Sequence, residues 1–244
     1  MTSCNSCRST SRDAVLAGVA EDGQEASPLL IWSSMSFSWM TDSTPDRKAR
    51  ALRRICVEMA VCLCGLLGMI NQANADEAAA WAALRLGGHV ALMRHADAPG
   101  GAGDPPGFNL NDCTTQRNLS DRGRADAKAV GDRLRAERVR VAKLLSSPWC
   151  RCLETARILN LGSVEIEPAF SNAFVLADRR DTLTRRAQDI IGGWKGPGTL
   201  LVVTHGANIQ ALTGYNPAAG EIIVVTAGPD AILREVGRVP VPRR

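Results

Sequence analysis

Residues 89–95 read HVALMRH, a short apolar run that ends in an arginine and a histidine. A run of this length predicts a buried strand, so Arg94 and His95 are expected at its carboxyl end. Ligands of open α/β sheets bind outside that edge. An imidazole there can act as a nucleophile or an acid–base, and a guanidinium can hold an anion in a planar fork. Because the pair is also compatible with a simple polar strand end, its meaning depends on the rest of the chain.

A second apolar run ends in the same way. Residues 199–205 read TLLVVTH and predict another buried strand that ends at His205. In a parallel sheet the ends of both strands, with His95 and His205, lie at one edge. Between them, residues 144–156 (LLSSPWCRCLETA) end a third strand and begin a helix with Arg151 in its first turn, where N–H groups and the helix dipole favour an anion. Two arginines and two histidines at one point predict a pocket for a dianion such as phosphate.

Strand and helix patterns alternate along the chain, which predicts a single three-layer αβα domain with a mostly parallel central sheet. The loop of residues 96–118 is rich in proline and glycine and too long for a mere connection, so we expect it to be functional. Ser120 follows as the N-cap of a helix whose apolar stripe extends to Leu134. The other expected elements are strands at 89–93, 141–146, 164–166, 199–204, 221–226 and 231–236, and helices at 150–159, 181–194 and around 209–212.

Residues 40–75 have the organisation of a secretory signal peptide. Basic residues precede the apolar stretch 59–70 (MAVCLCGLLGMI), and a small-x-small site predicts cleavage after Ala75. An apolar core of this length is too short for the roughly 20 residues of a spanning helix, so no stable membrane span is expected after cleavage. Residues 1–39 show no sustained periodicity and are expected to be disordered or an over-extended reading frame that in fact starts at Met40 rather than Met1. The exported domain is then 76–244.

Composition limits the class of partner. The full chain has 29 Lys+Arg and 25 Asp+Glu, a net charge of +4, and 4% aromatic residues. This mild, arginine-rich excess does not indicate a nucleic-acid groove, but it suits a site for an anionic substrate. The oligomeric state is left open by the sequence.

Three of the eight cysteines, Cys113, Cys150 and Cys152, belong to the expected exported domain. An odd number in an exported protein is consistent with one disulfide and one free thiol. Cys150 and Cys152 are too close to bridge each other easily, so Cys113 is expected to pair with one of them. A C-x-C pair without a nearby histidine does not make a zinc site, and no metal is expected.

Four motifs in this order resemble those of the histidine phosphatase superfamily, the phosphoglycerate-mutase-like family. The resemblance spans roughly residues 88–226. The motifs are Arg94-His95-Ala96; Leu119-Ser120-x-x-Gly123 with Ala127 in the next helix; Ser147-Pro148 with Arg151 and Glu154-Thr155-Ala156; and Thr204-His205-Gly206.

The resemblance implies a phosphatase that hydrolyses phosphomonoesters through a phosphohistidine. His95 would be the nucleophile that attacks phosphorus. Arg94, Arg151 and His205 would hold the phosphoryl oxygens, and no metal or other cofactor would be required. Arg117, near the end of the long loop, and Asn208 are further candidates for substrate binding. The alternatives are an ion pair of Arg117 with Asp112 or Asp121, and a helix-capping role for Asn208.

The general acid that protonates the leaving group is not evident. One branch of the family has an aspartate directly after the second histidine, where this chain has Gly206. The other uses a glutamate shortly after the third strand, where residues 167–174 read EPAFSNAF and place Ser171 and Asn172. The remaining candidates are Asp97, Asp104, Glu167 and Glu221.

Two functions therefore follow from the sequence. The first is an exported phosphatase, periplasmic or secreted, that acts on a small phosphorylated molecule, a phosphoglycan or a phosphoprotein. The second is a non-catalytic phosphate- or phosphoglycan-binding protein of the same fold that has lost the general acid. A carboxylate within reach of the leaving-group oxygen would distinguish the first from the second.

Overall fold

The computed structural model describes residues 54–59, 76–101, 103–228 and 232–242, all within one compact unit that begins at residue 51. The segment 1–39 and nearly all of the predicted leader, 40–75, lie outside the described residues. Of the helices that the model describes, none has the length and apolar character needed to span a bilayer.

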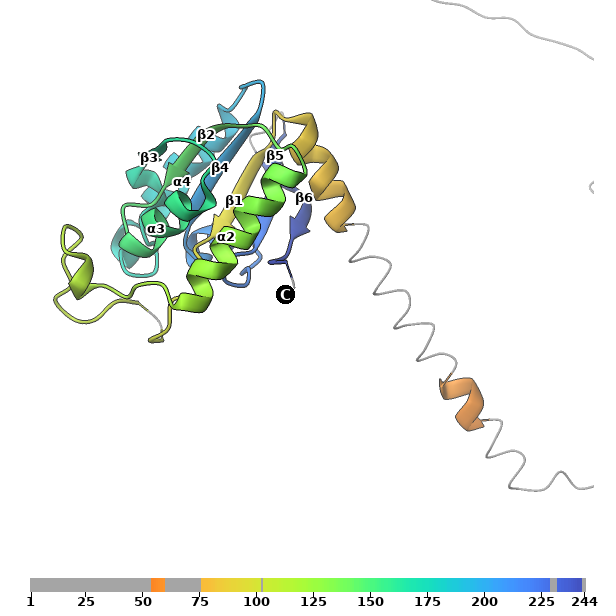
Figure 1. The fold of residues 1–244 in the computed structure, drawn as a ribbon, viewed down its shortest axis with the longest axis horizontal. Helices are drawn as coiled ribbons and strands as arrows, with labels where there is room; N and C mark the ends of the chain where they lie inside the picture. Colours follow the sequence, from red (N-terminus) through yellow and green to blue (C-terminus); the bar gives the residue numbers. More distant parts are fainter. Residues whose placement is uncertain (1–53, 60–75, 102, 229–231, 243–244) are drawn as a thin grey trace, which may run out of the picture. The chain divides into compact units, whose positions relative to one another are not determined.

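A six-stranded mixed sheet forms the centre of the domain, with the strand order β3-β2-β4-β1-β5-β6 (Figure 1). The first four strands of this order are mutually parallel, β5 is antiparallel to β1, and β6 is antiparallel to β5. The predicted α/β class with a mostly parallel sheet is therefore confirmed. The strands are β1 (Val90–Arg94), β2 (Val141–Ser146), β3 (Val164–Ile166), β4 (Thr199–Thr204), β5 (Ile222–Ala227) and β6 (Leu233–Val239).

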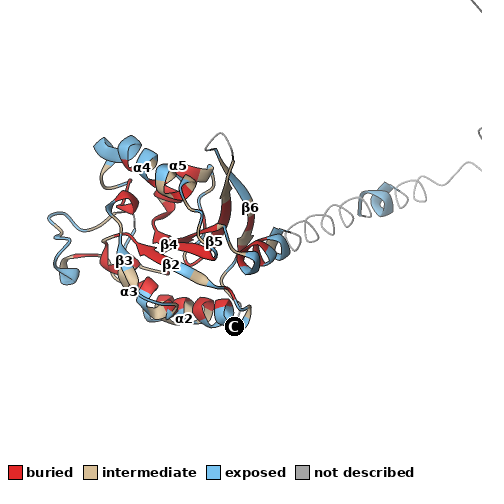
Figure 2. Cartoon of the chain, turned by 90° about the horizontal axis from the view of Figure 1, so that it is seen from above, coloured by how far each residue is buried: buried red, intermediate tan, exposed pale blue. Residues whose placement is uncertain are grey.

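Helices cover both faces of the sheet. Figure 2 shows α4 and α5 on one side and α2 and α3 on the other, which gives the three expected layers. The helices are α2 (Asp121–Ala136), α3 (Cys150–Leu159), α4 (Arg180–Gly192), α5 (Gly206–Thr213) and the short 3-10 helices η1 (Cys113–Thr115), η2 (Pro168–Phe170) and η3 (Ala177–Arg179).

The alternation of side chains along β1 explains its central place. Val90 and Leu92 pack into the apolar cluster beneath α4 and α5, whereas Ala91 and Met93 pack into the cluster beneath α2 and α3. Successive strand residues point to opposite faces, so a strand that is apolar throughout is stable only with both faces covered. β1 meets this requirement between β4 and β5.

Some element bounds differ from the expected ones by one to three residues, and one helix is additional. The helix of residues 76–86 buries Ala80, Trp81 and Leu84 in the same cluster as α2 and α3. It approaches β6 closely, and the glycine at position 237 permits this. A Cβ at Gly237 would lie 2.1 Å from the carbonyl oxygen of Asp76. This contact joins two distant parts of the chain, and for that reason the local pattern did not predict it.

The packing of α2 on α3 depends on a glycine. A Cβ added at Gly131 would lie 2.3 Å from the carbonyl oxygen of Leu159, far inside van der Waals contact. The two helix backbones can therefore approach only because position 131 has no side chain. Since Arg151 lies on α3, this contact also determines the position of the Arg151 backbone.

We expect Gly131→Ala to lower the free energy of unfolding by about 1–3 kcal/mol, because α2 and α3 must separate to admit the methyl group. The matched control is Gly192→Ala, also in a helix, where an added Cβ meets nothing within 4 Å. That variant should leave stability unchanged or raise it by up to about 1 kcal/mol. Urea unfolding monitored by circular dichroism measures both, and equal effects would contradict the packing argument.

Candidate active site

The two histidines of the predicted pocket lie side by side. β1 and β4 are adjacent and parallel, with Arg94 opposite Thr204, so the next residue of each strand leaves the sheet at the same edge. The backbone N–H of His95 donates to the carbonyl of Thr204 at 2.9 Å. The ring centroids of His95 and His205 are 5.5 Å apart. The structure thus brings together the two strand ends that the sequence pattern indicated.

His95 is a buried, neutral imidazole with a fixed ring orientation. Its Nδ1 lies 2.8 Å from the carbonyl oxygen of Ala96. A carbonyl can only accept, so Nδ1 carries the proton and Nε2 has a free lone pair. Burial, and then the charge of Arg151, lowers the pKa of His95 to about 3. The ring therefore stays unprotonated at neutral pH with Nε2 available for attack.

Arg151 lies against both rings. It is the second residue of α3 and is 1% exposed. Its Nε donates to Nε2 of His95 at 3.3 Å, and its Nη2 lies 3.4 Å from Nδ1 of His205. The hydroxyl of Thr155 donates to the carbonyl of Arg151 and accepts from the backbone N–H of Ala96, which connects the start of α3 to the residue after the nucleophile.

His205 is held by hydrogen bonds on both ring nitrogens. Because Arg151 faces its Nδ1, Nε2 is the protonated nitrogen, and it donates to the hydroxyl of Ser147 at 2.8 Å. Burial, followed by electrostatic repulsion from His95 and Arg151, places the pKa of His205 well below its ordinary value. The sulfur of Cys152 is 3.6 Å from Nε2, and burial raises the pKa of this thiol to about 12, so it remains protonated beside the ring.

Arg94 and Arg117 complete a ring of positive charge. Arg94 donates from Nη1 to the carbonyl of Pro217 at 2.8 Å. Within the described part of the chain, the buried side-chain N and O atoms without a hydrogen-bond partner are Nε of Arg94 and Nε of Arg117. Burial, and then the neighbouring charge of Arg151, lowers the pKa of both guanidinium groups. Buried donors without acceptors beside like charges are the surroundings in which an anion is stabilised.

A cavity of about 250 Å³ lies where these groups meet. It is lined by all four predicted pocket residues and by Arg117, a predicted candidate for substrate binding. The lining residues are Arg94, His95, Gly101, Gly103, Arg117, Arg151, Asn172, Phe174, His205, Gly206, Ala207, Gln210 and Asn216.

Each of the four carboxylates considered as general acids accepts a hydrogen bond from another group of the protein. Asp97 accepts from the hydroxyl of Ser120 at 2.6 Å, at the start of α2. Glu167 accepts from the backbone N–H of Ala169 and caps η2. Asp104 is paired with Arg151, with Nη1 and Oδ1 2.6 Å apart.

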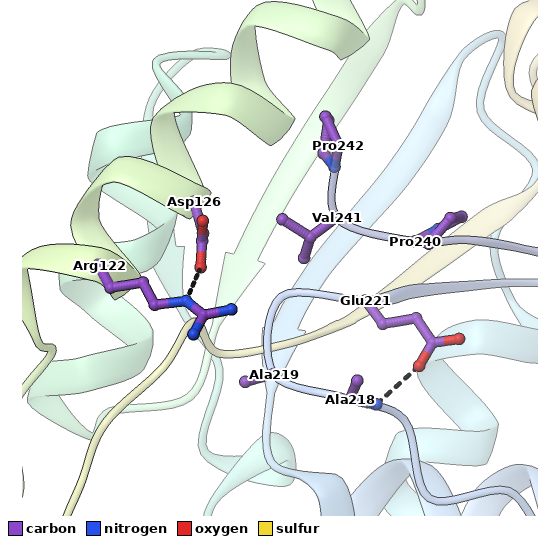
Figure 3. A pocket seen from close by; sticks show the side chains of 8 residues that line it. All are labelled: Arg122, Asp126, Ala218, Ala219, Glu221, Pro240, Val241 and Pro242. Carbon is purple, nitrogen blue, oxygen red and sulfur yellow. Dashed lines mark hydrogen bonds and ion pairs between the residues drawn. The ribbon is translucent and has the colours of Figure 1, made fainter. Parts of the chain in front are cut away.

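Glu221 lies at the expected edge of the sheet but is not among the residues that line the cavity of the two histidines. Its carboxylate accepts from the backbone N–H of Ala218 at 2.6 Å and from the hydroxyl of Tyr215 at 3.3 Å. Figure 3 shows this contact at a second cavity of about 760 Å³, between α2 and the C-terminal segment. An ion pair of Arg122 with Asp126 lines the other side of that cavity.

The two further candidates for substrate binding have different surroundings. Asn208 uses both ends of its amide on the backbone: Oδ1 accepts from Ala173 N–H at 3.1 Å and Nδ2 donates to the carbonyl of Ser171 at 2.8 Å. It therefore braces the segment after η2 and does not line the cavity. Arg117 does line it. Asp112 accepts from Thr114 instead, and Asp121 pairs with Arg124.

Sequence patterns did not indicate three polar residues of the cavity. Gln210 lies on α5, one turn after Gly206, a spacing that could have suggested it. Asn216 follows the end of α5 without any motif. A Cβ at Gly206 would lie 2.6 Å from Oδ1 of Asn216, so the glycine after the second histidine provides the space for this amide. Asn172 had been noted only as the residue near the expected place of an acid.

The long loop is fastened to the N-terminus of α3. A disulfide joins Cys113 to Cys150, with the Cα atoms 5.6 Å apart, and Cys152 is a free, buried thiol. Gln116 adds a hydrogen bond in which its Oε1 accepts from the backbone N–H of Cys150 at 3.0 Å. Of the two expected pairings, the structure therefore contains the one that links the loop to the residue before Arg151.

Comparisons with known proteins find both a family and similar structures. Residues 90–175 match the model of the histidine phosphatase superfamily (branch 1). The chain is similar to the structure of the protein histidine phosphatase SixA complexed with tungstate, at 19% identity, with 62% of this chain and 96% of that chain covered and a TM-score of 0.41. A phosphoserine phosphatase from Entamoeba histolytica is similar at 14% identity, with 62% and 96% covered and a TM-score of 0.43. A mycobacterial glucosyl-3-phosphoglycerate phosphatase is similar at 16% identity, with 62% and 99% covered and a TM-score of 0.45. The search of curated proteins gives no match.

The matched region extends from β1 through α3 to the segment that contains Asn172. It therefore includes His95 and Arg151, whereas His205 lies beyond it and is brought to the same edge by the pairing of β1 with β4. The order of the motifs, the three-layer fold and the family match agree. Residues 90–175 therefore match the histidine phosphatase superfamily (branch 1), and the remaining residues lie outside the match.

Proposed function

We propose that this protein is a phosphatase that hydrolyses phosphomonoesters through a phosphohistidine on His95. One observation carries the proposal: a neutral, buried histidine with an unprotonated Nε2 lies within a ring of three guanidinium groups. Two of these groups, on Arg94 and Arg117, hold buried Nε–H donors without acceptors. A phosphoryl dianion beside His95 would supply these acceptors and offset the repulsion among the arginines.

The reaction would proceed in two displacements. In the first, the lone pair of His95 Nε2 attacks phosphorus in line, the P–N bond forms and the P–O bond to the leaving group breaks. The leaving oxygen keeps that electron pair and takes up a proton from solvent water, to which the attacking water of the second step returns one. In the second, water attacks phosphorus, loses a proton, and the P–N bond breaks to release inorganic phosphate and restore neutral His95.

The arginines would provide most of the rate acceleration. Phosphoryl transfer demands stabilisation of charge on the equatorial oxygens, and preorganised donors supply this at little cost in reorganisation. Arg94, Arg117 and Arg151 converge on the cavity from β1, the long loop and α3. We propose that these arginines stabilise the phosphoryl oxygens without a metal ion. The size of the cavity, about 250 Å³, suits a small phosphorylated molecule or the terminal phosphate of a phosphoglycan.

A second function has its own supporting observation. The candidate acids Asp97, Asp104, Glu167 and Glu221 all accept hydrogen bonds from other groups of the protein. A binding protein that retains the arginines but never transfers the phosphoryl group would have the same arrangement. The two functions differ in whether a phosphohistidine forms on His95.

We expect His95→Ala to abolish the release of phosphate from an aryl phosphate, because no other group offers a lone pair at this position. The matched control is His89→Ala, since His89 precedes β1 at the opposite end of the strand and contacts the carbonyl of Gly87. The control should retain activity, and so should the wild-type protein in the presence of EDTA. Acid-labile phosphate trapped on the wild-type protein at short times, and lost in His95→Ala, tests the intermediate; full activity of His95→Ala would disprove it.

The low pKa of the buried His95 should make the free energy of unfolding depend on pH in the acid range. Burial and Arg151 hold the native pKa of His95 at about 3, whereas an unfolded histidine binds a proton near pH 6.5. As the pH falls below that value, only the unfolded chain takes up this proton, so the free energy of unfolding falls by up to about 1.4 kcal/mol for each pH unit. We expect His95→Asn to reduce this slope between about pH 6 and about pH 4. Urea unfolding over this range measures the slope, and an unchanged slope would refute a neutral His95.

We also propose that the protein is exported after cleavage behind Ala75. The described helical residues 76–86 lie after that site, so cleavage there preserves the buried Trp81 and Leu84. The disulfide between Cys113 and Cys150 is typical of an oxidising compartment. N-terminal sequencing of the mature protein should begin at Asp76. An intact leader on the mature, active protein would overturn the proposal.

A further inference from the structure

Asp104 is a buried carboxylate from the long loop, and it accepts four hydrogen bonds. Its side chain and that of Arg151 are 0% and 1% exposed. Oδ1 accepts from Nη1 of Arg151 at 2.6 Å and from the backbone N–H of Arg117 at 3.2 Å. Oδ2 accepts from Nη2 of Arg151 at 3.2 Å and from Nε1 of Trp149 at 2.9 Å. Both oxygens are thus fully used within the protein.

Asp104 occupies the Nη1–Nη2 edge of the Arg151 guanidinium. The adjoining Nε–Nη2 edge faces the two histidines. Nη1 and Nη2 face Asp104, whereas Nε faces Nε2 of His95 and Nη2 also lies 3.4 Å from Nδ1 of His205. A guanidinium is planar and its donors have a rigid fork geometry. A carboxylate that holds the Nη1–Nη2 edge therefore determines the plane and direction of the adjoining Nε–Nη2 edge.

The charge of Asp104 is compatible with this role. Burial alone would raise its pKa, but the hydrogen bonds and the charge of Arg151 outweigh burial, and the pKa lies below its ordinary value. The carboxylate is ionised at neutral pH and has no proton to give to a leaving group.

The loop that carries Asp104 is held in place independently of this ion pair. The disulfide of Cys113 with Cys150 and the hydrogen bond of Gln116 to the backbone of Cys150 join the loop to the first turn of α3. Trp149, which donates to Asp104, is the N-cap residue of the same helix. Asp104 and Arg151 therefore approach each other from two segments that are already connected.

We infer that Asp104 is a positioning residue, which aims the Nε edge of Arg151 at the phosphoryl group bound beside His95. The inference rests on the proposed phosphatase function for its kinetic consequence but not for its structural one. It excludes Asp104 as the general acid, and it also excludes the opposite role, that of an internal anion which the substrate must displace from Arg151.

The kinetic test compares an aryl phosphate with an alkyl phosphate in Asp104→Asn. A misaligned Arg151 stabilises the transition state less whatever the leaving group, so we expect kcat to fall by up to about 100-fold for both substrates and by a similar factor. KM should change much less, because the lost negative charge offsets weaker binding by Arg151. Asp104→Glu, which keeps the charge and both acceptors, should recover part of kcat. The matched control is Asp121→Asn, which removes an exposed carboxylate that pairs with Arg124 and should retain wild-type kinetics.

Other outcomes would overturn the inference. A loss confined to the alkyl phosphate would make Asp104 the general acid, since only the poorer leaving group needs its proton. An unchanged or higher kcat in Asp104→Asn would make it a displaceable internal anion or a bystander. Thermal unfolding of each variant, with assays well below its Tm, separates these effects from loss of the folded state.

A second measurement does not require turnover. The Nε–H of Arg151 should give a slowly exchanging NMR signal in the wild-type protein and in Asp121→Asn, assigned by its loss in Arg151→Lys. We expect the signal to exchange rapidly with solvent in Asp104→Asn. If it stays protected there, Asp104 does not position Arg151, even if the wild-type protein proves inactive and the phosphatase proposal fails.

Discussion

The parallel pairing of β1 with β4 is the constraint on which the active site depends. Its register sets Arg94 opposite Thr204, so His95 and His205 leave the sheet together. A slip of one residue would turn every side chain of a strand to the other face. The apolar residues on both faces of each strand oppose such a slip, because they fill the clusters beneath α2 and α3 on one side and α4 and α5 on the other.

The distribution of charge at this edge of the sheet favours the binding of an anion. Arg94, Arg117 and Arg151 surround one cavity, both histidine rings are neutral, and Asp104 pairs with Arg151 without lining the cavity. The carboxylate offsets part of the positive charge but leaves the inner donors free to meet an anion. Such donors are most effective when they are already in place before the anion arrives, since little reorganisation is then required during the reaction.

The long loop of residues 96–118 contributes two side chains to the site. It supplies Arg117 to the cavity and Asp104 to Arg151. A loop of this length is costly to order, and the disulfide between Cys113 and Cys150, 37 residues apart in sequence, contributes about 2–4 kcal/mol against that cost. The same bond anchors the loop at α3, so the order of the loop and the geometry of Arg151 are coupled.

Local patterns by themselves determined the elements and the main site. The runs 141–146, 150–159, 164–166 and 199–204 have the same bounds in sequence and structure, because burial and capping act on neighbouring residues. The convergence of His95, Arg151 and His205 also follows from strand ends in a parallel sheet. Only the tertiary structure decided the partner of Asp104, the backbone contacts of Asn208, the place of Asn216 and the docking of residues 76–86 on Gly237. Those contacts join segments far apart in the chain, and their free energy depends on burial and hydrogen bonding that exist only once the layers have packed.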